Sequence, residues 1–96
     1  MKDLKEVTKN LKSLVDFIND GAEGKIENLS EDQAAKVESE ATRLFSKASN
    51  EEIIKLTEKV ATMNILTMNI HFFDNLPNIW SILQNATEIT VKVEAD

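Results

Sequence analysis

Cysteine and tyrosine are absent from the 96-residue chain, and proline, tryptophan and histidine each occur once. Without cysteine, disulfides, thiolate metal sites and thiol nucleophiles are excluded, which suits a reducing compartment, and we expect the cytoplasm. No apolar run approaches the roughly 20 residues that a membrane-spanning helix needs, and charged residues interrupt the N-terminal stretch. We therefore expect neither membrane insertion nor a signal peptide.

Basic residues are also scarce, since 11 Lys and Arg stand against 17 Asp and Glu, for a net charge of −6. A grip on nucleic-acid phosphates needs clustered basic side chains, so nucleic acid is disfavoured as a partner. Hydrophobic residues make up 42% and charged residues 29%, close to ordinary globular proteins. With only two glycines and one proline to interrupt helices, this composition predicts a folded helical domain.

The first half of the chain carries two helix patterns. Apolar residues spaced by three and four positions predict a helix over residues 2–19, which we expect to end at Asp20 and Gly21. Ser30 and Gln33 form the pattern of a capping box, in which each side chain bonds the other residue's backbone, at the start of a helix over residues 31–48.

The second half predicts a third long helix and a short fourth one. Ser49 is the expected N-cap of the third helix, and the apolar residues that follow lie on two faces of this helix as far as Asp74. Pro77 cannot continue a helix and favours a new start, so a short helix is expected from about residue 77. The predicted fold is all-α, an up-and-down antiparallel bundle of three long helices and one short helix.

Residues 1–88 are expected to form this single domain. The following segment, 89–96, alternates apolar Ile89, Val91 and Val93 with polar residues, and nothing else in the chain could pair with it as a strand. We expect an extended or frayed C-terminal tail.

Four polar residues lie along the seam between the two apolar faces of the third helix. Three of them recur every seven residues, a spacing at which buried polar groups can bond across helices. The predicted buried polar seam consists of Thr57, Asn64, Thr67 and His71.

An apolar surface is expected in the same half, because only Asp74 and Glu88 carry charge between Val60 and Val91. The apolar side chains there exceed what the predicted neighbouring helices can cover, which favours an interface with a second chain, most simply a homodimer. The predicted interface consists of Leu66, Phe72, Phe73, Ile79 and Trp80.

His71 raises an alternative of another class, histidine phosphotransfer. Small acidic four-helix phosphotransfer domains carry one exposed histidine, typically followed three positions later by lysine and soon after by glycine. Here Asp74 stands in the lysine position, and its charge would repel a phosphoryl group. A structural role is therefore favoured for His71.

Residues 16–27 partly match a calcium-binding loop, with Asp16, Asp20, Gly21 and Glu27 at suitable positions. Ile18, however, occupies a position that should offer an oxygen ligand. We therefore predict a helix end followed by an acidic loop, with no metal bound.

No spacing in the sequence places a nucleophile beside a base, so we expect neither catalysis nor a cofactor. The predicted function is a non-enzymatic protein–protein interaction module, a regulatory or adaptor subunit that self-associates. The alternative is an inhibitor or immunity-type protein whose acidic surface meets a basic target.

Overall fold

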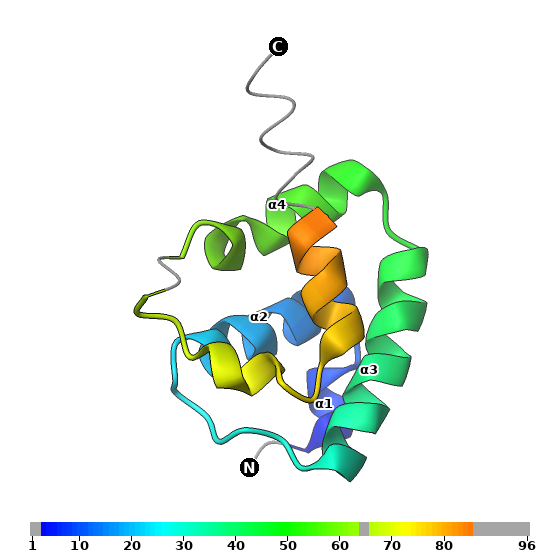
Figure 1. The fold of residues 1–96 in the computed structure, drawn as a ribbon. Coiled ribbons are helices and arrows are strands. Elements are labelled where there is room, and N and C mark those ends of the chain that lie inside the picture. Colours follow the sequence, from blue (N-terminus) through cyan, green and yellow to red (C-terminus); the bar gives the residue numbers. More distant parts are fainter. Residues whose placement is uncertain (1–2, 64–65, 86–96) are drawn as a thin grey trace.

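A computed structural model describes residues 3–63 and 66–85 of the chain, and within these ranges the fold is all-α, with no strand (Figure 1). The predicted fold class is confirmed. The elements are α1 (Leu4–Val7), α2 (Leu11–Ala22), α3 (Glu31–Ser46), α4 (Asn50–Ala61), the 3₁₀ turn η1 (Ile70–Phe73), and a helix over residues 77–85, here called the last helix. Asn64 and the predicted tail 89–96 lie outside the described residues.

The single helix predicted over residues 2–19 is divided into α1 and α2. Asn10 is extended (φ −155°, ψ 169°), and its side-chain oxygen accepts a hydrogen bond of 2.8 Å from the Ser13 amide. Asn10 is therefore the N-cap of α2, and the apolar spacing continues across the break without revealing it.

The end of α2 also differs from the expectation, because Gly21 lies inside the helix and Gly24 ends it. Gly24 has φ +77°, a conformation that side chains with a Cβ rarely adopt. The amide of Lys25 donates to the Asp20 carbonyl at 2.9 Å, and that of Gly24 donates to the Gly21 carbonyl at 3.1 Å. This pair of bonds is a Schellman motif.

The two predicted serine caps are confirmed. Ser30 Oγ accepts from the Gln33 amide at 3.2 Å, while Gln33 Oε1 accepts from the Ser30 amide at 3.1 Å. Ser49 Oγ accepts from the Glu52 amide at 3.2 Å and opens α4. Local side-chain chemistry thus fixes where α3 and α4 begin.

The long third helix predicted to reach Asp74 instead ends at Ala61. The Thr62 hydroxyl donates to the Glu58 carbonyl at 2.9 Å, and the chain then leaves the helix. Further on, the Asn69 amide donates to the carbonyl of Ala22 at 2.8 Å, which ties the return of the chain to the end of α2. The chain thus returns to α2 where a continuation of α4 was predicted.

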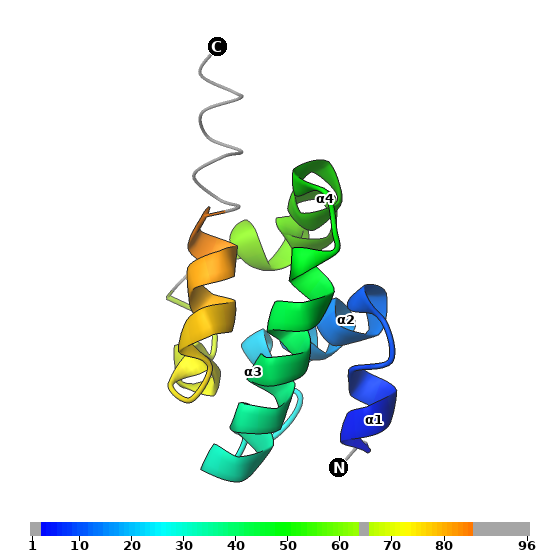
Figure 2. The same ribbon diagram turned by 90° about the vertical axis from the view of Figure 1, so that its right-hand side faces the viewer.

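The last helix lies beside α3 and runs in the same direction, while α2 crosses behind them (Figures 1 and 2). Its neighbours are therefore not all antiparallel, which is where the arrangement differs from a simple up-and-down bundle. The core lies between these helices and is built from apolar side chains of every element. Its largest fully buried apolar members are Leu14, Ile18, Val37, Phe72, Leu76 and Ile79.

Candidate functional site

Three of the five predicted interface residues are buried within the chain itself. Phe72 is 1% exposed, Phe73 is 5% exposed and Ile79 is fully buried. Phe72 packs edge-on against Phe17, with 5.8 Å between ring centroids, and against Phe73 at 5.4 Å. The prediction overcounted the surface, because α4 ends at Ala61 and the chain returns to pack η1 on the core, where both phenylalanines are buried.

The other two predicted interface residues keep apolar surface in contact with solvent. Leu66 is 88% exposed, and Trp80 is half-buried with its ring 5.1 Å from that of Phe73. Ile70, which the prediction left out, is 38% exposed and borders a shallow hollow of about 200 Å³ with Phe73 and Trp80. We call Leu66, Ile70 and Trp80 the edge patch.

The predicted buried polar seam is not a continuous feature, because α4 ends before it is complete. Thr57 is buried, and its hydroxyl donates to the Ile53 carbonyl at 2.6 Å, within its own helix. Thr67 and His71 are exposed. The prediction of a seam required one helix through residues 57–71, whereas α4 ends at Ala61.

His71 lies on the surface beside Asp74. Its Nδ1 is 3.2 Å from Asp74 Oδ2, and the side chains are 76% and 66% exposed, respectively. An exposed pair of this kind contributes little to stability, so a purely structural role for His71 has weak support.

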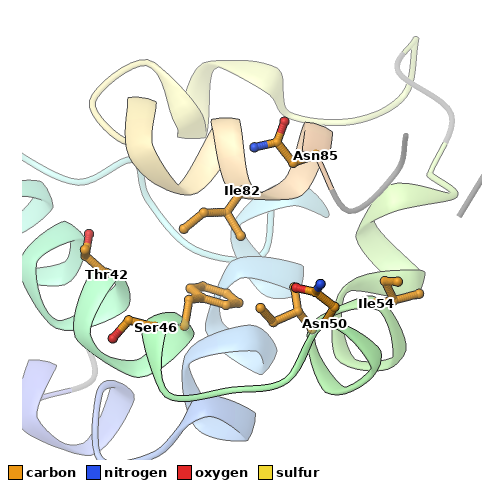
Figure 3. A pocket seen from close by; sticks show the side chains of 8 residues that line it. Thr42, Ser46, Asn50, Ile54, Ile82 and Asn85 are labelled. Atoms are coloured by element: carbon orange, nitrogen blue, oxygen red, sulfur yellow. The ribbon is translucent and has the colours of Figure 1, made fainter. Parts of the chain in front are cut away.

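A groove that sequence reasoning missed lies between the C-terminal end of α3, the beginning of α4 and the last helix (Figure 3). Its volume is about 430 Å³. Ile82 points from the last helix toward the corner between α3 and α4. The lining combines apolar and neutral polar side chains: Phe45, Ile53, Ile54, Ile82, Thr42, Ser46, Asn50 and Asn85.

Helical spacing could have indicated each wall of this groove separately. Thr42 and Ser46 are four residues apart on α3, and Asn50 and Ile54 are four apart on α4, so each pair shares a face. The sequence did not show that these faces and the last helix would meet, since that depends on the direction in which the last helix runs.

Glu38 joins α3 and the last helix, which are two walls of the groove, one helical turn before the groove begins. Glu38 is 8% exposed, and its Oε2 accepts a hydrogen bond of 2.9 Å from the Ile79 amide. The bond links the middle of α3 to the first turn of the last helix.

Glu23 links the loop after α2 to α4. Its two carboxylate oxygens bind Lys25 Nζ at 2.7 Å and Lys59 Nζ at 2.6 Å. Hydrogen bonds from these two ammonium groups lower the pKa of Glu23 from 4.5 to about 2, and the Glu23 carboxylate raises the pKa of Lys25. With its charge matched by two lysines, Glu23 acts as a tertiary link.

The partial calcium-loop match falls mostly on helix, because residues 16–22 belong to α2. Among the described residues, no three carboxylate or imidazole groups converge where a metal ion could bind. No helix in the described part of the chain is long and apolar enough to cross a membrane.

The groove, the edge patch and the His71–Asp74 pair are surface features of the described residues to which a function can be attached. Comparison of the chain with protein-family models, curated proteins and solved structures finds no match.

Proposed function

We propose that the protein is a non-enzymatic interaction module, a regulatory or adaptor subunit that receives an amphipathic helix of a partner protein in the groove. The observation that carries the proposal is the apolar lining formed by Phe45, Ile53, Ile54 and Ile82. Helix-in-groove recognition uses such a surface for apolar anchors spaced by three, four and seven residues.

The polar part of the lining favours a peptide over a charged metabolite. None of the described residues that line the groove is charged, so an anion such as a phosphate would find no counter-charge among them. Ser46, Asn50 and Asn85 supply hydroxyl and carboxamide groups, which can bond the polar edge of a peptide at the rim.

Selection from a display library of helical peptides tests the proposal. Peptides that bind the wild-type chain should carry regularly spaced apolar anchors and should bind an Ile54→Asp variant at least about tenfold more weakly, since a charge would enter the apolar contact. The matched control is Leu66→Asp, which places the same charge on the edge patch and should leave this binding unchanged. Ligands that bind the Ile54→Asp variant normally and lose affinity for Leu66→Asp would contradict the groove assignment.

The nature of the partner separates an adaptor from the inhibitor alternative. An inhibitor of a basic target would use the net charge of −6, and its association rate would fall steeply with salt. Binding dominated by the groove is expected to depend little on salt, because the lining residues within 3–63 and 66–85 are uncharged.

Histidine phosphotransfer remains a second candidate, and the exposure of His71 favours it. A phosphoacceptor must be reachable by its donor, and the imidazole is 76% exposed. The Asp74 carboxylate, 3.2 Å from Nδ1, would repel an incoming phosphoryl group, so we rank this function below the interaction module.

A further inference from the structure

The last helix begins without a side-chain cap of its own. The Leu76 carbonyl accepts the first helical bond, from the Trp80 amide at 2.9 Å, so Leu76 occupies the N-cap position. Its side chain is apolar and fully buried, and Pro77 has no amide hydrogen to donate. The Glu38 carboxylate of α3 takes the acceptor position that a serine or aspartate cap would normally fill.

This borrowed cap lies directly below the groove. Glu38 is four residues before Thr42 on α3, so the two share a helical face, and Thr42 lines the groove. Ile79, which donates the bond, is three residues before Ile82 on the facing helix. The two helices are joined at this level, and one turn further along they border the groove.

The bond between Glu38 and the Ile79 amide is buried, so its loss would destabilise the position of the last helix beside α3. Glu38 and Ile79 are 8% and 0% exposed, so without the Glu38 carboxylate the Ile79 amide would find little water to bond while the last helix stays in place. A carboxylate at a helix N-terminus also interacts favourably with the helix dipole. Beyond this point the last helix faces the open groove through Ile82 and Asn85.

We infer that Glu38 is a positioning residue for the groove: its bond to the Ile79 amide holds the last helix, one wall of the groove, beside α3, and loss of this bond would let the last helix separate before the remainder of the fold. The inference concerns the same groove as the proposed function. Its test needs no partner, so its failure would leave the groove as a possible binding surface, while failure of peptide binding would leave the role of Glu38 intact.

Trp80 allows the last helix to be followed separately, because it is the only tryptophan in the chain and lies on that helix. In urea, Trp80 fluorescence should follow separation of the last helix, and far-UV circular dichroism should follow loss of all helices. In the wild type the two transitions should coincide. In Glu38→Ala the fluorescence transition should move to lower urea than the dichroism transition, and Glu38→Gln, which keeps an acceptor oxygen, should restore much of the coincidence.

A second measurement reports on the groove wall under native conditions. Because the chain has no cysteine, Ile82→Cys introduces a unique thiol whose labelling rate measures how often the wall opens. Combining it with Glu38→Ala should raise the rate about tenfold or more, as expected for loss of a hydrogen bond to a charged group. Glu40→Ala is the matched control, since it removes an exposed carboxylate that belongs to the same helix and pairs with nearby Arg43.

Two results would overturn the inference. One is a Glu38→Ala variant whose fluorescence and dichroism transitions remain coincident, at whatever stability, since Glu38 would then support the whole fold equally. The other is an Ile82→Cys labelling rate that Glu38→Ala changes no more than Glu40→Ala does.

Discussion

The ring of Phe72 lies against the backbone of Gly21, so closely that a Cβ atom added to this glycine would come within 2.3 Å of two ring carbons. Gly21 is helical and buried in α2, and Phe72 belongs to η1, fifty-one positions further along the chain. Because Gly21 has no side chain, it leaves the space in which the ring of Phe72 packs against α2.

Gly21→Ala is expected to destabilise the fold. Alanine favours a helix over glycine by about 1 kcal/mol, but forcing a methyl group against Phe72 costs about 1 to 3 kcal/mol, so the clash should prevail. Urea unfolding gives the free energy. In a Phe72→Leu background the added methyl group should cost less, because the smaller side chain leaves room for it, and a double-mutant cycle measures this coupling. Greater stability of Gly21→Ala would show that the ring does not pack there.

The Glu23 link should make stability depend on pH in the acid range. The pKa of Glu23 is about 2 in the folded chain against 4.5 in the reference state, so the unfolded chain takes up the proton first as pH falls. The stabilisation is complete above pH 4.5 and is lost as pH falls through about 2. Urea midpoints measured across this window should fall less steeply in Glu23→Gln than in the wild type.

Lys59→Gln provides a graded comparison for this test. It removes one of the two cations, so Glu23 keeps only Lys25 and the acid dependence should lie between those of the wild type and Glu23→Gln. An unchanged pH dependence in both variants would mean that other carboxylates account for the acid behaviour.

Helix starts were predictable because they depend on residues close together in sequence. The two bonds between Ser30 and Gln33, and the bond that the Glu52 amide donates to Ser49 Oγ, each join positions three apart. Asn10 makes the same kind of local bond to the Ser13 amide, and it went unrecognised because the apolar spacing continues through it. Caps can thus be hidden by a periodic pattern that spans two helices.

The second half was less predictable, because its structure depends on bonds between distant positions. Asn75 Nδ2 donates to the Leu29 carbonyl, and the Ile79 amide donates to Glu38, across separations of 46 and 41 residues. No local pattern announces such bonds. The groove and the burial of Phe72 against Phe17 and Gly21 likewise join positions far apart in sequence, which is why the predicted interface included side chains that the chain covers itself.

Incubation with small phosphodonors such as acetyl phosphate is expected to leave His71 unmodified. Asp74 faces the imidazole and would oppose the approach of the phosphoryl group. Phosphorus NMR of the treated protein gives the measurement, since phosphohistidine has its own signal. A signal that appears in the wild type and is absent in His71→Gln would support phosphotransfer and displace the interaction module as the leading function.

Self-association should be weak if it occurs through the edge patch. A standard interface buries about 800 Å² on each partner, which exceeds what two aliphatic side chains and part of an indole can supply. With Phe72, Phe73 and Ile79 covered by the chain itself, the edge patch offers a partner copy Leu66, Ile70 and part of Trp80.

Sedimentation equilibrium from micromolar to near-millimolar concentration should therefore show a 10.8 kDa monomer that associates only toward the upper end. Leu66→Asp tests the edge patch, because the side chain is 88% exposed and its replacement should not disturb the core. Phe73→Glu is not a suitable variant, since a charge at a buried position would unfold the chain before it reported on any interface.

Leu66→Asp should abolish the association at high concentration, whereas Ile54→Asp in the groove should leave it in place. A dimer that persists at micromolar concentration and survives Leu66→Asp would need a larger apolar surface than the edge patch, and loss of that dimer in Ile54→Asp would identify the groove as the surface that a second copy covers.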